Sequence, residues 1–323
     1  MQPFAYARPD TLPEALALLG KQWGEVEVLA GGSDLLGLLK DYVVTPQRVV
    51  DIKGIRELGG IRKTSSGLRI GALVTFDELA ENAAVRADYP ALTAAARGVA
   101  SPQIRNVGTV AGDLCQRPRC WYFRLGYGLL ARGKDGKSLV QDGDNRYHAI
   151  LGNQGPAKFV SASSLGPALI ALGAQLRLAS SGSSRLIPAE KFFVTPENES
   201  QRETALQPGE IVSEILLPPA RGIRSATYEV RQKESLDWPL AAAAVAVQKK
   251  GETVARARIV LGHVAPIPWV ATQAERALAG RPITPESIEV AAQSAVAEAT
   301  PLSGNEYKVQ LTKVAVKRAL LAL

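Results

Sequence analysis

The stretch "EVEVLAGGSDLLGLLK", residues 25–40, predicts a β-strand that ends at two glycines and continues as a helix. Apolar residues alternate before the glycines, and leucines recur at helical spacing after Asp34. A strand–turn–helix unit of this kind exposes backbone N–H groups at the turn, where an anion can bind. A tight connection without a ligand has the same pattern, so the stretch alone leaves both interpretations open.

The whole chain has 323 residues, enough for two or three domains, and an ordinary globular composition. It contains no run of about 18 apolar residues, the length that a membrane helix needs. The N-terminal residues do not resemble a secretory signal, so we expect a cytoplasmic protein without a membrane span. The net charge of +7 comes from basic residues spread along the chain, and we therefore expect no nucleic-acid binding.

Cysteine and histidine are scarce, which excludes several kinds of site. The two cysteines, Cys115 and Cys120, provide no disulfide framework and too few ligands for a zinc tetrahedron. For His148 and His263 we favour packing roles over catalysis, and no G-x-S-x-G hydrolase motif occurs. The chemistry is therefore expected to belong to a bound cofactor.

The first 114 residues predict alternating strands and helices. Capping boxes at Thr11–Glu14 and Thr75–Glu78 predict two helix starts, and residues 48–52 and 67–73 predict strands. Residues 115–155 predict a long loop that is rich in glycine and charge. Its basic cluster from Arg117 to Lys137 is a candidate docking surface for a partner.

Beyond this loop, residues 157–161 and 175–180 predict strands on either side of a serine-capped helix. The last third predicts four successive strands of one antiparallel sheet and then three helices. The strands are expected at 210–218, 225–232, 239–251 and 253–264, and Asp237–Trp238 is expected to start a strand. A domain boundary is expected between Ser180 and Gln207.

A second glycine turn, Thr109-Val110-Ala111-Gly112-Asp113, is similar to the first in composition and is predicted to follow another β segment. In both turns glycine permits close approach of a ligand, and freed N–H groups can bind phosphate oxygens. Neither turn matches the G-x-G-x-x-G or P-loop pattern. Two such turns in one α/β region favour a cofactor site of another type.

The motifs "LAGGSDLL" and "SPQIRNVGTVAGDL" closely resemble those of the FAD-binding medium subunits of molybdenum hydroxylases, of the xanthine dehydrogenase, carbon monoxide dehydrogenase and aldehyde oxidoreductase type. The resemblance extends to "FAYARPDTLPEALALL" and "YEVRQKESLDWPLAAAAVAV", and so to nearly the whole chain. It implies an α+β fold with a two-subdomain FAD-binding domain of the PCMH (vanillyl-alcohol oxidase-like) type. A smaller α+β domain follows, similar to the C-terminal domain of the carbon monoxide dehydrogenase flavoprotein.

The domains implied are 1–180, with subdomains of about 1–55 and 56–180 and the loop insertion 115–155, and 208–323. The resemblance also implies which residues contact FAD, and it implies no catalytic side chain. The first turn would wrap the pyrophosphate with Val28, Leu29, Ala30, Gly31, Gly32, Ser33, Asp34 and Leu35. The second turn would form another wall with Thr109, Ala111, Gly112 and Asp113. Further contacts are expected from Ser164, where relatives commonly have an aspartate, and from Arg231 or Lys233, near a lysine of many relatives. The strand expected to start at Asp237–Trp238 would lie beside the flavin.

The loop 115–155 resembles that of one branch, the aldehyde oxidoreductase and 4-hydroxybenzoyl-CoA reductase-like flavin subunits, in which four cysteines bind a [4Fe-4S] cluster. Cys120 matches the first of them, and the other three fall near Leu129, Ser138 and Ala157. Because a cluster needs nearly its full set of thiolates, we expect no [4Fe-4S] cluster and no other metal here. A cluster shared across a subunit interface is the alternative.

The function implied is electron transfer within a heterotrimer. Substrate would be oxidised in a large molybdenum-cofactor subunit, and electrons would cross the [2Fe-2S] clusters of a small subunit to FAD in this chain. An external acceptor such as NAD or a quinone would take them up. Two alternatives remain open, a self-sufficient flavin-dependent oxidoreductase on the same fold and a cofactor-free scaffold subunit.

Overall fold

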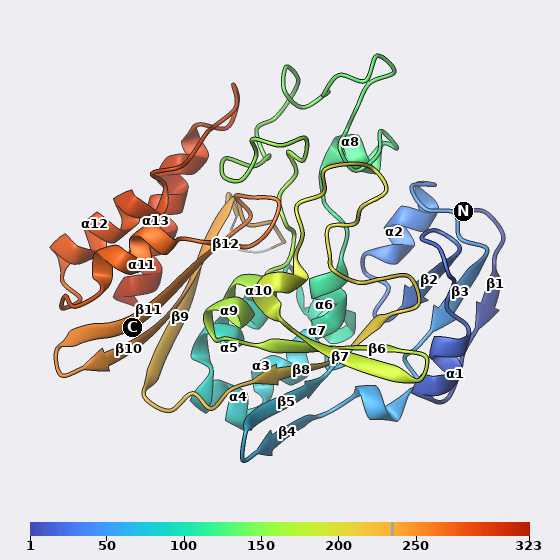
Figure 1. Ribbon diagram of the computed structural model, residues 1–323, viewed down its shortest axis with the longest axis horizontal. Helices are drawn as coiled ribbons and strands as arrows, with labels where there is room; N and C mark the ends of the chain where they lie inside the picture. Colours follow the sequence, from blue (N-terminus) through green and yellow to red (C-terminus); the bar gives the residue numbers. More distant parts are fainter. Residues whose placement is uncertain (234–235) are drawn as a thin grey trace.

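The computed structural model describes residues 1–233 and 236–323, and their strands form three sheets (Figure 1). The first sheet is parallel, in the order β1-β3-β2, and two short helices connect its strands. These elements are β1 (Ala5–Ala7), α1 (Leu12–Ala17), β2 (Val26–Leu29), α2 (Leu35–Lys40) and β3 (Arg48–Asp51). The predicted capping box of Thr11 and Glu14 is confirmed, as are the strand and helix on either side of the first glycine turn.

The second sheet is antiparallel, in the order β4-β5-β8-β6-β7. Its strands are β4 (Ile61–Thr64), β5 (Gly67–Gly71), β6 (Gln175–Ser180), β7 (Ser183–Pro188) and β8 (Ile211–Leu217). The assignment of residues 210–218 to the C-terminal sheet is therefore wrong. Ile215, in the middle of β8, pairs with Ile70 of β5 and with Leu176 of β6. Apolar alternation shows which face of a strand is buried and does not identify its partner strand. We propose that the domain boundary follows β8.

Short helices pack around the second sheet and continue its core. They are η1 (Arg56–Leu58), α3 (Phe76–Glu81), α4 (Ala83–Asp88), α5 (Pro90–Gly98), α6 (Pro102–Val107), α7 (Val110–Cys115), α9 (Leu165–Ala171) and α10 (Ala189–Phe192). The capping box of Thr75 and Glu78 is confirmed at α3. The β segment predicted before the second glycine turn is instead α6, because Ser101 caps a helix that begins at Pro102.

The predicted strand at 157–161 is also absent from the described structure, where this segment is extended without a strand ladder. Single backbone hydrogen bonds hold it, such as Ala149 N–H to the Lys158 carbonyl at 2.9 Å and Ser161 N–H to the Ala265 carbonyl at 2.9 Å. The helix predicted after it is α9, and the strand at 175–180 is β6.

The C-terminal sheet is antiparallel, in the order β12-β11-β10-β9, and three helices cover one of its faces (Figure 1). These elements are β9 (Ile223–Val230), β10 (Ala241–Lys250), β11 (Thr253–Gly262), β12 (Trp269–Val270), α11 (Thr272–Leu278), α12 (Pro285–Ala295) and α13 (Tyr307–Leu321). The predicted helices and the strands of β9–β11 are confirmed. Asp237 and Trp238 precede β10 and do not start it.

The alanine-rich strand β10 is a wall common to two cores. Ala244 and Ala246 pack into the core of the second sheet, whereas Ala243 and Val245 pack into the core under α11–α13. Small side chains on both faces let helices of either side approach the strand closely. The C-terminal sheet is therefore buried on both faces near β10.

The long loop crosses the top of the molecule in Figure 1 and contains one short helix, α8 (Trp121–Arg124). Phe123 is buried in a small cluster with Leu38 of α2, so the loop packs on the fold at this residue. Lys308 of α13 is almost fully buried, and its ammonium donates to the carbonyls of Tyr147, His148 and His263. Among the described helices, none has the length and apolar character to cross a membrane.

Candidate functional site

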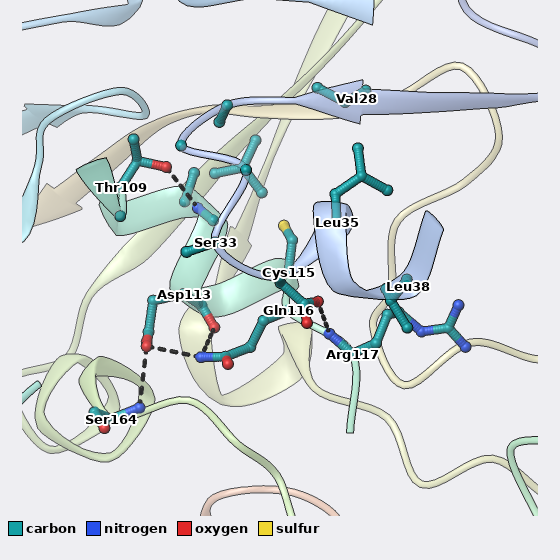
Figure 2. A pocket seen from close by; sticks show the side chains of 18 of the residues that line it. Val28, Ser33, Leu35, Leu38, Thr109, Asp113, Cys115, Gln116, Arg117 and Ser164 are labelled. Atoms are coloured by element: carbon teal, nitrogen blue, oxygen red, sulfur yellow. Dashed lines mark hydrogen bonds between the residues drawn. The ribbon is translucent and has the colours of Figure 1, made fainter. Parts of the chain in front are cut away.

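A cavity of about 310 Å³ lies where the two glycine turns, the long loop and the segment before β10 meet (Figure 2). Its apolar wall comes from strands and helices of the first two sheets, including Val28, Leu35, Leu38, Ile52 and Phe76. Charged side chains, among them Asp34, Arg117 and Arg119, also line the cavity. An apolar cavity with a few convergent polar groups is the usual form of a cofactor site.

The cavity brings together nearly all of the residues that the sequence predicts as FAD contacts. Only Leu29, whose side chain packs against the small core between β2 and α2, and Lys233 do not line it. Lys233 is exposed, and its backbone N–H donates to the Asp237 carboxylate at 3.1 Å. Arg231 lines the cavity and forms an ion pair with the partly buried Glu229.

The first glycine turn needs glycine at two positions for different reasons. A Cβ on Gly31 would lie 1.9 Å from the carbonyl oxygen of Val107, so this turn touches the backbone before the second turn. Gly32 has a φ of +74°, which a side chain disfavours. Within the described residues, the backbone N–H groups of Gly31, Gly32 and Ser33 donate to no carbonyl. The turn therefore presents free donors to a ligand, as an anion site requires.

The second glycine turn has a different role from the one expected. Its N–H groups are already used: Val110 donates to the Val74 carbonyl, Ala111 to that of Ala72, and Gly112 to the Thr109 hydroxyl. The expectation that both turns offer freed N–H groups is thus wrong for this one. Thr109, as the N-cap of α7, uses its oxygen as an acceptor and keeps its O–H free to donate.

Asp113 anchors the second turn to α9. Its carboxylate accepts hydrogen bonds from the Ser163 hydroxyl, from the N–H groups of Ser164 and Leu165, and from the Gln116 amide, part of which Figure 2 shows. Burial raises the pKa of Asp113 to about 6, although these donors favour the charged form. Ser164 thus meets the site through its backbone, and Ser163 supplies the hydroxyl that accepts from Gly166 at the start of α9.

The long loop reaches the cavity through its arginines. Asp34 accepts from the backbone N–H of Arg117 at 2.8 Å and from the Arg124 guanidinium at 2.7 Å, and Arg119 pairs with it at 3.0 Å. This part of the basic cluster is therefore directed inward and is not available as a docking surface. Arg132, Lys134 and Lys137 remain exposed.

Arg117 and Arg202 pair with two further carboxylates that line the cavity, Glu203 and Glu27. Arg117 pairs with Glu203, and Arg202 lies 3.9 Å from Glu27. Burial raises the pKa of both glutamates, and Arg117 opposes that shift. The Arg202 guanidinium also stacks 4.7 Å from the ring centroid of Trp23, which lines the cavity.

The histidines and cysteines have packing environments. Burial lowers the pKa of His148 to about 4 and that of His263 to about 3, so both are neutral at pH 7. The thiol of Cys120 lies 3.2 Å from His148 Nε2. Cys115 lines the cavity, and burial raises the pKa of its thiol to about 12. That the chain holds no iron–sulfur cluster stays a prediction.

Several residues of the cavity were not predicted as site residues from the sequence. They are Trp23, Arg119, Arg202 and Glu203. Trp238, expected at a strand start, instead stacks on Arg119 with 4.7 Å between the guanidinium and the ring centroid. A lone arginine or tryptophan in a loop gives no sequence signal, because its role depends on a neighbour far along the chain.

Two family models together match almost the entire chain. The model of the FAD binding domain in molybdopterin dehydrogenase matches residues 2–220, and that of the CO dehydrogenase flavoprotein C-terminal domain matches residues 226–323.

Curated proteins and solved structures are similar over the same length. The carbon monoxide dehydrogenase medium chain of Hydrogenophaga pseudoflava is 31% identical over 99% of this chain and 96% of its own. The aldehyde oxidoreductase FAD-binding subunit PaoB of Escherichia coli (strain K12) is 33% identical over 97% of this chain and 96% of its own. A solved structure of the Hydrogenophaga pseudoflava carbon monoxide dehydrogenase lacks the Mo-pyranopterin moiety of the cofactor. One of its chains aligns with this chain with a TM-score of 0.78 and 31% identity, over 100% of this chain and 98% of that chain.

Proposed function

The chain belongs to the family of FAD-binding medium subunits of the molybdenum hydroxylases, and from this premise we propose that it is the electron-transfer subunit of such an enzyme. It is an oxidoreductase subunit whose cofactor is FAD. We propose that electrons arrive from [2Fe-2S] clusters of a small partner subunit, after substrate oxidation in a large molybdenum-cofactor subunit, and leave to an external acceptor. Bound FAD supplies the two-electron chemistry, and the protein supplies its position and surroundings.

The observation that carries this proposal is the first glycine turn. Gly31, Gly32 and Ser33 present N–H groups without acceptors in the described structure, in a cavity that also has an apolar wall. A Cβ at Gly31 would occupy the narrow contact between the two turns. These features fit a dinucleotide, since its diphosphate needs donors and its rings need apolar surface.

The charged groups of the cavity support electron transfer over proton transfer. Asp34 and Glu203 are paired with arginines, and Asp113 accepts four hydrogen bonds from its surroundings. A general acid or base needs a free pair of electrons or a free proton aimed at the substrate. The paired carboxylates of this cavity offer neither a free electron pair nor a free proton, which weakens the alternative of a self-sufficient flavoenzyme.

The visible spectrum of the purified chain tests the proposal. After addition of FAD and removal of the excess, we expect flavin bands that dithionite bleaches, without a broad iron–sulfur shoulder. A chain that stays colourless after reconstitution would overturn FAD binding and favour a scaffold. Iron and sulfide in stoichiometric amounts would overturn the expected loss of the cluster.

Assembly with the large and small subunits is tested separately. The three chains are co-expressed and purified through a tag on this one, and we expect them to elute together in size-exclusion chromatography. Substrate should then bleach the flavin bands of the complex but not those of the isolated chain. A chain that is reduced by substrate alone would favour the self-sufficient enzyme.

A further inference from the structure

Arg119 joins three segments that are far apart in the sequence. Its side chain extends from the long loop to Asp34 at the first glycine turn, with 3.0 Å between Nη1 and Oδ1. Its Nη2 donates to the Gln116 side chain at 2.9 Å, and Trp238, from the segment before β10, stacks on its guanidinium at 4.7 Å. All four residues line the cavity. Arg119 therefore lies at the meeting point of the loop, the turn and the C-terminal domain.

The positive charge of Arg119 is not needed to neutralise Asp34. The same Oδ1 atom also accepts from Arg124 at 2.7 Å, and Oδ2 accepts from the backbone N–H of Arg117 at 2.8 Å. A carboxylate with one guanidinium and one N–H already has the partners of a normal buried ion pair. Arg119 is thus a second cation beside a carboxylate that has been neutralised by the first.

Arg119 also has unused donors. A guanidinium carries five N–H donors, and within the described part of the chain one of them donates to Gln116 while Nη1 forms an ion pair with Asp34. Its Nε is buried without a partner among the described residues. Burial lowers the pKa of Arg119, but an arginine stays charged in the pH range of folded proteins. A charged group with free donors on a cavity wall needs an anion to complete its surroundings.

The electrostatics of this part of the cavity point to the same anion. Arg119 forms an ion pair with Asp34, and the Asp113 carboxylate, which also lines the cavity, acts to raise the pKa of this guanidinium. A diphosphate bound at the first glycine turn would bring negative charge into the cavity that Asp113 lines, and the hydrogen-bond partners of Asp113 in the described structure are neutral donors. The Arg119 guanidinium offsets this repulsion and matches phosphate oxygens in shape and number of donors.

Trp238 holds the guanidinium in a fixed plane. The stacked ring comes from a turn in which the Asp237 carboxylate accepts the backbone N–H groups of Gln232, Lys233 and Trp238. Stacking on an aromatic face orients a guanidinium while its N–H groups stay available in the ring plane. Trp238 is therefore a positioning residue for Arg119.

We propose that Arg119 binds the diphosphate of FAD and that Trp238 positions it for this contact. The inference rests on the proposed function, since it takes the cavity as the FAD site, and it extends that function by naming a side chain of the long loop as a cofactor ligand. The loop would then have a role in binding, and the C-terminal domain would contribute to it through one stacked ring.

Equilibrium binding of FAD and ADP to the full chain tests the proposal. FAD binding is followed by the quenching of flavin fluorescence, and ADP binding by competition with FAD. Arg119→Gln should raise the Kd of both ligands by the same factor, about 10- to 100-fold, because both contain the diphosphate. Arg119→Lys should lie between, since it keeps the charge without the planar fork. The matched control is Arg132→Gln, which removes an exposed arginine of the same loop and should change neither Kd.

Further variants separate positioning from folding. Trp238→Phe should retain most of the affinity, and Trp238→Ala should lose affinity several-fold. The thermal unfolding temperature of the ligand-free chain should stay the same within about 2–3 °C, as for a surface change. Unchanged binding of FAD by Arg119→Gln would overturn the proposal. So would a loss confined to FAD with ADP unaffected, which would place the contact on the flavin side. Failure of the unsubstituted chain to bind FAD would instead overturn the proposed function.

Discussion

The substitution Gly31→Ala tests whether the two glycine turns form one binding site. A Cβ at this position would lie 1.9 Å from the Val107 carbonyl oxygen and 2.7 Å from its carbonyl carbon, whereas real contacts begin near 3.0 Å. The two backbones must therefore separate by about 1.1 Å, and no side-chain rotation can relieve the contact. Overpacking of this kind costs about 1–3 kcal/mol. If the bound state requires the native spacing, the Kd of FAD rises about 5- to 150-fold.

Flavin fluorescence titration measures the Kd, and thermal unfolding of the ligand-free chain measures the cost to the fold. The control is Gly37→Ala in α2, where a Cβ meets nothing within 4 Å. Alanine is the better helix former by about 1 kcal/mol, so this control should bind FAD normally and unfold at a higher temperature. A Gly31→Ala chain with normal affinity and a normal unfolding temperature would refute the contact. Lower stability with normal affinity would refute the link between turn spacing and FAD binding.

Three further predictions concern buried polar groups. Asp113→Asn should destabilise the chain more at pH 4 than at pH 7. Because the pKa of Asp113 is raised to about 6 in the native state, the stability that this residue contributes is lost as pH rises from 3.8 through 6. Urea unfolding at both pH values measures the difference. His148→Phe should reduce the fall in unfolding free energy between pH 6.5 and 4 by up to about 1.4 kcal/mol per pH unit. The pKa of His148 is lowered to about 4 in the native state, so over this range the unfolded chain binds a proton that the native state does not bind. Lys308→Met should destabilise the folded chain by about 1–3 kcal/mol at pH 7, because it leaves the carbonyls of Tyr147 and His263 without their donor. The same urea unfolding measures this loss. A more stable variant would show that the cost of burying the ammonium is the larger effect.

Local chemistry explains which elements the sequence could predict. Thr11 and Thr75 each begin a helix because a hydroxyl and a glutamate three residues later can satisfy two N–H groups reciprocally, and this depends only on adjacent residues. The first glycine turn was predictable for the same reason, since Gly32 supplies a positive φ between a strand and a helix. The partners of β8 were not predictable, because its apolar residues would be buried equally well in either antiparallel sheet.

The residues of the candidate site also divide into those that local sequence could predict and those that it could not. Gly31 and Thr109 could be predicted because short motifs contain them, and the resemblance to a family placed the two motifs in one site. The side chains of Arg119 and Trp238 meet across more than a hundred residues of chain, and no short-range pattern in the sequence indicates that they pair. The second turn shows the converse, since its motif is intact but the N–H groups of Ala111 and Gly112 are already used within the fold.

The pairing of charges in the cavity explains why an arginine matters more there than the glycine motifs suggest. Asp34 and Asp113 are both needed for structure, because one ties the first turn to the long loop and the other ties the second turn to α9. Asp34 is neutralised by Arg124, but the Asp113 carboxylate lines the same cavity with neutral hydrogen-bond donors as its partners in the described structure. Backbone N–H groups alone would therefore bind a diphosphate against the repulsion of Asp113. Arg119 is a further cation on the cavity wall, so we expect its removal to weaken FAD binding while Asp34 keeps Arg124 and the fold stays intact.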